Sequence, residues 1–226
     1  MRILCLSDIH GHADALAAVL AMAERTGYGR ILVAGDLCFP GPEPLEVWRR
    51  LSQLRAVCVQ GSGDRALATV ETDALRPRDD FERSRLERLI EVREELGSSI
   101  LKKLASLPSS VCLPTGAGGQ LMLTHGSPQD PLEPLTHDMT DEAMAALIGD
   151  APVDIILCGG SHVPFDRMLA REAATSQPQG GVRVINLGSV GEAPTLNERL
   201  AHATFIDMTK GEIHVEQMSV PLGRAA

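Results

Sequence analysis

The feature that most constrains the fold is the alternation of apolar runs and helical patterns in the first sixty residues. Apolar runs at Ile3–Leu6, Ile31–Ala34 and Ala56–Val59 are separated by helical patterns at Ala13–Glu24 and Pro44–Leu54. A strand-helix-strand order is typical of parallel strands, because a parallel connection needs a long crossover that a helix usually supplies. The sequence therefore predicts an α/β fold that begins with three neighbouring parallel strands.

Each of these three apolar runs ends in a polar cluster. The clusters read S-D-I-H at 7–10, G-D at 35–36 and G-S-G-D at 61–64. Ligands of open α/β sheets bind beyond the carboxyl ends of the strands. We therefore expect the three clusters to meet at one edge of the sheet and to form a site there.

The middle of the chain has a helical pattern and the remainder has short strands. Residues 80–107 carry leucine and isoleucine at helical spacing, interrupted at Gly97 and closed by Pro108, which predicts two helices. Beyond Pro108 we expect a helix at Asp141–Ile148 and strands at Val111–Leu113, Leu121–Thr124, Ile155–Cys158, Val182–Asn186, Thr204–Asp207 and Glu212–Gln217. Two of these strands again end in polar clusters, T-H-G at 124–126 and G-G-S-H at 159–162.

The length and composition indicate one compact domain. A chain of 226 residues with 44% apolar residues can bury most of the surface that its unfolded form would expose. We expect a single domain over residues 1–220, with the helical pair 80–107 inside it and a frayed tail at 221–226. The five cysteines form no C-x-x-C pair, and we expect them to be reduced thiols that pack into the core from strand bodies without binding metal.

Charge and hydropathy exclude several classes of partner. The net charge is −9, and the 21 Lys and Arg residues are spread over the whole chain, which argues against non-specific binding of nucleic acid. The first apolar run has only about five residues before the acidic residue Asp8, which is too short for the apolar region of a signal peptide or for a membrane span. We therefore expect no signal peptide, no membrane contact and a cytoplasmic location. If the substrate carries phosphate, the positive charge facing it has to come mainly from bound metal, because few cationic side chains are available.

The polar clusters predict a metal site when they are taken together. Alone, D-x-H at 8–10 and G-D at 35–36 are weak signals, since such aspartates often cap helices or form turns. Five clusters with Asp or His, each at the end of an expected strand, are much more specific. Mixed carboxylate and imidazole ligands suit Zn, Mn or Fe, and two such ions can activate a water and hold a phosphoryl group.

The same segments resemble the calcineurin-like metallophosphoesterases over almost the whole length. The matching segments are S-D-I-H-G-H at 7–12, G-D-L-C at 35–38, G-S-G-D at 61–64, T-H-G-S-P at 124–128, G-G-S-H-V-P at 159–164 and N-L-G-S-V-G at 186–191. L-A-S-L-P after the helical pair, followed by T-H-G-S-P-Q-D-P, is most similar to the small bacterial phosphodiesterase-type branch. The resemblance implies a four-layer αββα sandwich with a two-metal site that hydrolyses phosphomonoesters or phosphodiesters.

The resemblance also implies which residues hold the two metals. It places Asp8, His10 and His162 on the first ion, Asp36 between the two ions, and His125 on the second ion.

Three positions depart from the family pattern. Ser62 stands where relatives usually have Asn, and Gly160 and Gly63 stand where they usually have His. The first two departures remove usual ligands of the second ion, and the third removes a His that assists the leaving group. We therefore expect one tightly bound divalent ion of Mn, Fe or Zn, with the second ion weak or absent.

Several residues near the clusters have two interpretations. Ser62 either reaches a metal through its hydroxyl or a water, or only forms a turn. His12 is a substrate contact, a general acid, an extra ligand, or a polar residue at a helix start. Arg65 contacts a phosphate oxygen or is simply solvated, and Asp64 orients the turn beside the site. His202 is expected at the surface of a late strand.

Two functions from different classes follow from these expectations. The first is a metal-dependent phosphoesterase that hydrolyses a small phosphate ester with a metal-bound water as nucleophile. The alternative is a catalytically weak or inactive family member that binds a phosphorylated ligand or a protein partner in the same cleft. A nucleotide-binding α/β domain without metal is disfavoured, because the first strand turn lacks G-x-G-x-x-G.

Overall fold

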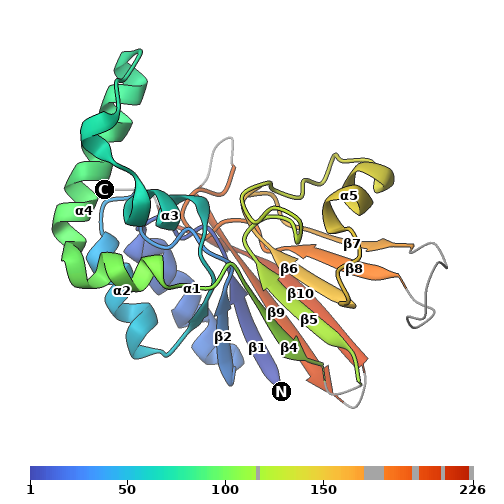
Figure 1. The fold of residues 1–226 in the computed structure, drawn as a ribbon. Helices are drawn as coiled ribbons and strands as arrows, with labels where there is room; N and C mark the ends of the chain where they lie inside the picture. The colour runs from blue at the N-terminus through green and yellow to red at the C-terminus, as the bar shows by residue number, and fades with distance from the viewer. Residues whose placement is uncertain (116–117, 171–180, 195–198, 210–211, 224–226) are drawn as a thin grey trace.

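The computed structural model describes residues 1–226 except 116–117, 171–180, 195–198, 210–211 and 224–226. Two five-stranded sheets pack face to face, with α1 to α4 on the outer side of one sheet and α5 on the outer side of the other (Figure 1). The predicted four-layer αββα arrangement is confirmed.

The first sheet contains the predicted parallel strands at the N-terminus. Its order is β10-β9-β1-β2-β3, with β1 (Arg2–Leu6), β2 (Arg30–Val33), β3 (Val57–Cys58), β9 (Leu200–Thr209) and β10 (Glu212–Pro221). β1, β2 and β3 pair in parallel, while β9 and β10 add an antiparallel edge beside β1. The parallel strands are connected through α1 (Ala13–Thr26) and α2 (Pro44–Gln53), as their helical patterns predict.

The second sheet is built from the C-terminal half of the chain. Its order is β4-β5-β6-β8-β7, with β4 (Ser110–Pro114), β5 (Gln120–Thr124), β6 (Ile155–Cys158), β7 (Phe165–Leu169) and β8 (Val182–Asn186). The three central strands β5, β6 and β8 are parallel, and α5 (Asp141–Ile148) packs on the outer face. The sequence analysis missed β7, which pairs antiparallel with β8 at the edge.

The core follows the two-residue periodicity of the strands. On β1, Ile3 and Cys5 lie in the cluster between the two sheets, whereas Leu4 and Leu6 lie in the cluster beneath the helices. β1 is therefore apolar on both faces, which is typical of a strand covered on both sides. This double burial fixes the position at which the strand ends and its polar residues emerge.

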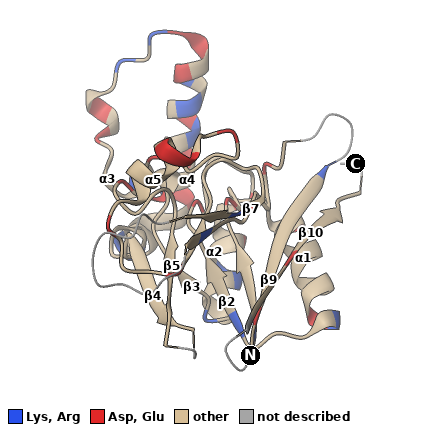
Figure 2. Cartoon of the chain, turned by 90° about the vertical axis from the view of Figure 1, so that its right-hand side faces the viewer, with Lys and Arg blue, Asp and Glu red and all other residues tan. Residues whose placement is uncertain are grey.

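A helical region between β3 and β4 stands partly clear of the sheets (Figures 1 and 2). It contains α3 (Ser62–Thr69), the short helix η1 (Thr72–Ala74) and α4 (Asp80–Ala105). α4 is broken at Gly97, where φ is 70° and ψ is 164°, so the predicted pair of helices is confirmed. α3 was not predicted as a helix, because G-S-G-D was interpreted as a turn.

The first half of α4 carries interspersed positive and negative side chains (Figure 2). Arg78, just before the helix, pairs with Glu82, and Arg88 pairs with Glu91 within it. This charge mixture is typical of a solvated helix face.

The last strand ends close to the domain boundary expected from the sequence. β10 extends to Pro221, which pairs with Leu200, so the last strand runs one residue past the expected domain boundary. Residues 224–226 of the expected tail lie outside the described residues. Among the helices of the described ranges, none combines the length and the apolar character that crossing a membrane requires.

The cysteines are free thiols, but they are not all in the core. Cys5 and Cys158 are buried in strands, and Cys38 is buried outside a strand. Cys112 is exposed on β4, so the expectation that every cysteine packs into the core is wrong for this residue. β4 is an edge strand, and its alternating burial exposes every second side chain.

Candidate metal centre

The five predicted ligands come together where the carboxyl ends of strands from both sheets meet. Asp8 and His10 follow β1, Asp36 follows β2, His125 follows β5, and His162 follows β6. Backbone hydrogen bonds fasten these loops to one another, because Asp8 N–H donates to Gly35 O at 3.1 Å and His10 N–H donates to Asp36 O at 2.9 Å. The site therefore lies across the edge of the sandwich.

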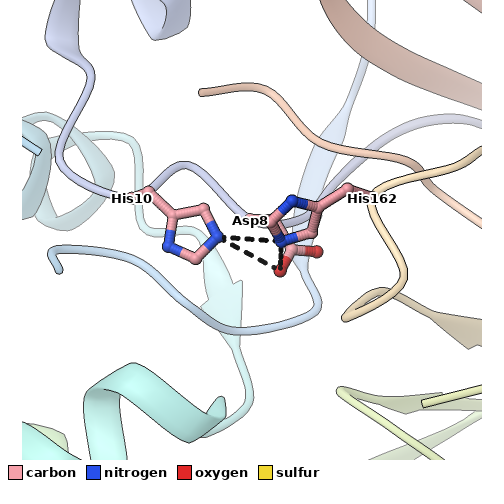
Figure 3. A group of neighbouring side chains, drawn as sticks. All are labelled: Asp8, His10 and His162. Carbon is pink, nitrogen blue, oxygen red and sulfur yellow. Dashed lines mark hydrogen bonds and ion pairs between the residues drawn. The ribbon is translucent and has the colours of Figure 1, made fainter. Parts of the chain in front are cut away.

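Asp8, His10 and His162 form the first group of potential metal ligands (Figure 3). Asp8 Oδ1 lies 3.5 Å from His10 Nε2 and 3.2 Å from His162 Nε2, and the two Nε2 atoms are 3.1 Å apart. Three ligand atoms thus point at one small space. Asp8 and His10 are buried, whereas the His162 side chain is 27% exposed.

Backbone carbonyls set the orientation of two of the imidazoles. His10 Nδ1 lies 2.6 Å from Phe39 O, and His125 Nδ1 lies 2.7 Å from Ala34 O. A carbonyl oxygen can only accept, so Nδ1 carries the hydrogen and a neutral ring keeps the lone pair on Nε2. In both histidines Nε2 is the atom that faces the site, and this is the arrangement in which an imidazole binds a metal.

Asp8, Asp36 and His125 form the second group. His125 Nε2 lies 3.5 Å from Asp36 Oδ2. Asp36 is held by two donors, the Gly63 N–H at 2.7 Å to Oδ1 and the Ser62 hydroxyl at 3.0 Å to Oδ2. Asp8 belongs to both groups of neighbouring donor atoms, and the shared position that the family resemblance gives to Asp36 stays a prediction.

The backbone at these ligands is unusual. Five non-glycine residues in the described part of the chain have a positive φ, and four of them are Asp8, His10, Asp36 and His162, with φ between 52° and 61°. The left-handed region is unfavourable for residues with a Cβ, and such strain persists where the surrounding structure enforces it, frequently at functional sites. The fold thus holds these four side chains in place at a cost in backbone energy.

Glycines allow the ligand loops to approach one another closely. A Cβ on Gly61 would lie 2.2 Å from Asp36 Oδ1, and a Cβ on Gly159 would lie 2.5 Å from Asp8 Oδ2. Any larger residue at either position would displace a carboxylate of the site. The glycines of G-S-G-D and G-G-S-H are therefore required by the geometry of Asp36 and Asp8.

The charges of the site favour a bound cation. Burial would raise the pKa of Asp8, but the neighbouring His10, His162 and His125 imidazoles hold that pKa well below its usual range. Burial would lower the pKa of His10, but Asp8, Asp36 and Glu192 raise it to about 9. In the absence of a metal the cluster thus retains protons, which means that it needs positive charge at its centre.

One buried atom tests whether a metal fits. Asp8 Oδ1 is buried and has no hydrogen-bond partner among the described residues, although two imidazole Nε2 atoms lie within 3.5 Å of it. A buried carboxylate oxygen without a partner is costly. A divalent ion between Oδ1 and the two Nε2 atoms would satisfy all three, and the donor set suits Mn, Fe or Zn.

Two further predicted site residues support Asp36 and its loop. Ser62 is the first residue of α3, and its hydroxyl donates to Asp36 Oδ2 while it borders the site. Asp64 is fully buried and accepts from the N–H groups of Gly61 and Leu37, both at 3.0 Å. Burial and the Asp36 charge raise the pKa of Asp64 to about 6. Asp64 is a positioning residue in this geometry, since its oxygens are used to hold the loop.

His12 and Arg65 do not line the hollow over the five ligands. A hollow of about 300 Å³ lies over the ligands, and we call it the metal hollow; it is lined by His10, Asp36, Pro40, Ser62, Arg85, His125, Gly126, Leu132, Pro134, Gly160, His162 and Glu192. His12 is half-buried at the start of α1, makes no capping hydrogen bond with its side chain, and lies outside this lining. Arg65 is exposed on α3 and lies outside it as well.

Sequence reasoning missed two charged residues of the metal hollow, Arg85 and Glu192. Glu192 Oε2 lies 3.8 Å from His10 Nε2. Glu192 directly follows N-L-G-S-V-G, which was a usable signal. Arg85 comes from α4, far along the chain from every strand-end cluster, so the strand-end pattern contained no signal for it.

The N-L-G-S-V-G loop fastens the first ligand. Ser189 Oγ donates to Asp8 O at 2.8 Å, and Gly191 N–H donates to the same oxygen at 3.0 Å. Gly188 has a φ of 68°, and a Cβ there would lie 2.5 Å from the His202 ring. His202 is buried against this turn, so its expected surface position is wrong: the turn covers the end of β9.

Known proteins resemble this chain in sequence and in structure. The uncharacterised protein MJ0912 of Methanocaldococcus jannaschii is 27% identical over 197 residues, which are 84% of this chain and 76% of that protein. The hypothetical protein PH1004 of Pyrococcus horikoshii OT3 superposes with a TM-score of 0.79 at 20% identity, over 99% of this chain and 89% of the other. A metallophosphoesterase of Sphaerobacter thermophilus superposes with a TM-score of 0.73 at 23% identity, over 96% of this chain and 88% of the other.

The two superpositions match the fold derived above, and the sequence model of the calcineurin-like phosphoesterase superfamily domain matches residues 1–210. That span includes every strand-end cluster and all five predicted ligands. The chain belongs to the calcineurin-like phosphoesterase superfamily.

Proposed function

We propose that this protein is a metal-dependent phosphoesterase that hydrolyses a small phosphodiester or phosphomonoester. The observation that carries the proposal is the convergence of the Asp8 carboxylate with the Nε2 atoms of His10 and His162 around a buried, unpaired Asp8 Oδ1. Membership of a phosphoesterase superfamily supports the same chemistry.

The proposed cofactor is a divalent transition metal, Mn, Fe or Zn. When bound, such ions supply a water nucleophile at neutral pH and neutralise charge on the phosphoryl oxygens. We place the tightly bound ion on Asp8, His10 and His162, and a weaker ion on Asp36 and His125. The second position is weak because Ser62 offers only a hydroxyl and Gly160 offers no side chain.

The protein's own residues hold the ligands and face the substrate. Gly160 N–H donates to Asp8 Oδ2 at 2.9 Å and leaves Oδ1 directed at the imidazoles. Arg85 lines the metal hollow and forms no salt bridge with the described residues. We assign to it the contact with a phosphate oxygen that the sequence analysis gave to Arg65, because its guanidinium is a strong partner for phosphate.

The departures from the family pattern keep a second function open. A weak or inactive member that binds a phosphorylated ligand or a protein partner in the same cleft would need the ligand shell but no efficient turnover. The supporting observation is the position of Gly160. A Cβ there would lie 3.5 Å from His125 Nε2, so the side chain that Gly160 lacks would have lain at the second metal position.

The partner and location remain proposals from the sequence. We propose a small phosphate ester as the substrate in the cytoplasm, without membrane contact. The net charge of −9 argues against a nucleic-acid backbone as a partner.

One experiment separates the two functions. Purified protein is freed of metal, reloaded with Mn²⁺, Fe²⁺ or Zn²⁺, and assayed with bis(p-nitrophenyl) phosphate and p-nitrophenyl phosphate. The phosphoesterase proposal predicts metal-dependent release of p-nitrophenol that Asp8→Asn abolishes. Methylphosphonate binding to the metal-loaded, folded protein without turnover of either ester would favour the binding function instead.

A further inference from the structure

A second cavity adjoins the metal hollow on the side of the helical region. It has a volume of about 470 Å³ and lies between α3, the segment that follows it and the first half of α4. We call it the side cavity, and its main apolar lining is Phe39, Ala66, Val70, Leu75, Leu86 and Leu89. Its size and its apolar walls with a few charged groups are those of a small-molecule site.

The side cavity and the metal hollow are continuous in their lining. Ser62 and Arg85 belong to both. Ser62 donates to Asp36, and Gly63, which lines the side cavity, also donates to Asp36 through its N–H. A molecule with one end near Asp36 therefore has the side cavity within immediate reach.

Phe39 connects the two spaces in another way. Phe39 lines the side cavity and is only 3% exposed, while its carbonyl oxygen accepts from His10 Nδ1 at 2.6 Å. The residue that orients a metal ligand thus also shapes the side cavity.

Arg85 lies where the side cavity meets the metal hollow, and its charge is not neutralised by a salt bridge to a described residue. Its guanidinium carbon lies 5.0 Å from the centroid of the Phe39 ring, and it forms no salt bridge within the described ranges of the chain. A cation above an aromatic ring at the edge of an apolar cavity can pair with an anion on one side and can stack with a flat ring on the other. This arrangement suits a phosphate group joined to an aromatic group.

We infer that the side cavity binds the organic part of the substrate, and that the substrate is a phosphate ester of a bulky aromatic group about the size of a nucleobase or naphthyl ring. The inference rests on the proposed function, since it places the phosphate in the metal hollow. The ring enters between α3 and α4, packs against Phe39, Leu86 and Leu89, and leaves the phosphate beside Arg85.

Two phosphonates that cannot be hydrolysed test this inference by calorimetry. Methylphosphonate carries only the phosphoryl anion, whereas (1-naphthyl)methylphosphonate adds the aromatic group. With the manganese-loaded full chain we expect the naphthyl compound to bind at least about tenfold more tightly, because its rings leave water for an apolar cavity.

Substitutions assign the gain to the side cavity. Ala66→Trp fills the cavity from α3 and should reduce the preference to less than about threefold, while methylphosphonate affinity changes less than about twofold. Thr69→Trp is the matched control, because Thr69 is exposed on the same helix outside both linings, and it should keep the full preference. If Ala66→Trp does not fold, Leu86→Gln makes one wall polar and should lower the preference at least about threefold.

The outcomes separate this inference from the proposed function. Equal binding of the two phosphonates by the natural chain overturns the inference and leaves the phosphoesterase proposal standing. So does a full preference for the naphthyl compound in folded Ala66→Trp or Leu86→Gln. Absence of methylphosphonate binding to folded, manganese-loaded protein overturns both. A preference that is lost in Ala66→Trp and kept in Thr69→Trp supports the side cavity as the ring site.

Discussion

The two halves of the metal centre differ in how completely the chain builds them. Around the first position, three ligand atoms from Asp8, His10 and His162 lie 3.1–3.5 Å apart. Around the second, Asp36 and His125 are 3.5 Å apart, their third neighbour Asp8 also belongs to the first group, and the adjoining positions are Ser62 and Gly160. The first group is thus closed, with three donors, whereas the second is open, because only Asp36 and His125 belong to it alone.

This difference shows that the hydrogen bonds that orient the ligand side chains do not determine how many ligands a metal position has. The second half is supported as carefully as the first, since Asp36 accepts from Gly63 N–H and Ser62 Oγ and His125 donates to Ala34 O. What it lacks is further ligand atoms of its own, since its third member, Asp8, is shared with the first group. We therefore expect a large difference in metal affinity between positions that are both well ordered.

Removal of the carboxylate common to both groups should have the largest effect. Asp8→Asn removes one negative charge from each group, and we expect Mn²⁺ affinity to fall at least about 100-fold, beyond the range typical of an outer-shell partner. Phosphoester hydrolysis should fall to the buffer rate. Equilibrium dialysis with metal analysis measures the affinity.

Two comparisons accompany Asp8→Asn. Asp36→Ala should remove the second ion and weaken the first, whereas Asp150→Asn, at an exposed position outside both groups, should change neither. Full metal content in folded Asp8→Asn would remove Asp8 from the centre.

Ser62→Asn should strengthen the open half. An amide oxygen at the start of α3 is a better ligand than a hydroxyl for a divalent ion, and we expect affinity for the second Mn²⁺ to rise at least about tenfold. Ser62→Ala is the opposite control, because it deletes the hydrogen bond to Asp36 and should weaken the second ion. If both variants bind the second ion as the natural chain does, position 62 has no part in the site.

Gly160→His should have a smaller effect, because the backbone opposes it. Gly160 has a φ of 73°, where a residue with a Cβ costs about 1–2 kcal/mol. We expect the free energy of unfolding to fall by that amount. Affinity for the second ion should rise about threefold to fivefold, which is below the range for a ligand without backbone strain. Gly160→Ala should show the same loss of stability without the gain, so a gain in Gly160→Ala would refute the ligand explanation.

Glu192→Gln should have the smallest effect, and it acts on the closed half. Glu192 Oε2 lies 3.8 Å from His10 Nε2, but its side chain is 38% exposed, so the lost attraction should be about 0.2–1 kcal/mol. That corresponds to a decrease of about 1.4-fold to fivefold in affinity for the first Mn²⁺. A decrease as large as that of Asp8→Asn would show that Glu192 is itself a ligand.

The ligands could be predicted from the sequence because they follow strands. The carboxyl ends of parallel strands meet at one edge, so Asp8, Asp36 and His125 were identifiable from D-x-H, G-D and T-H-G without any contact information. The strand-helix order of the first sixty residues likewise predicted the parallel part of the first sheet.

The rest depends on contacts between distant segments. Arg85 reaches the metal hollow only because the first half of α4 packs against α3, and no pattern near residue 85 indicates this. α3 was missed because Gly61 and Gly63 resemble a turn, although Asp64 accepts from Gly61 N–H and stabilises the helix start. The sharing of Asp8 between two ligand groups also needs distances, since its position in the sequence places it with His10 alone.

Manganese titration of the metal-free protein tests the unequal metal centre most directly. Free Mn²⁺ is followed by electron paramagnetic resonance, and bis(p-nitrophenyl) phosphate hydrolysis is measured at the same concentrations. We predict one tightly bound ion per chain, a second ion at least about tenfold weaker, and hydrolysis that requires bound metal. Two ions bound with equal affinity would contradict the inequality of the two halves, and no binding by folded protein would contradict the metal centre itself.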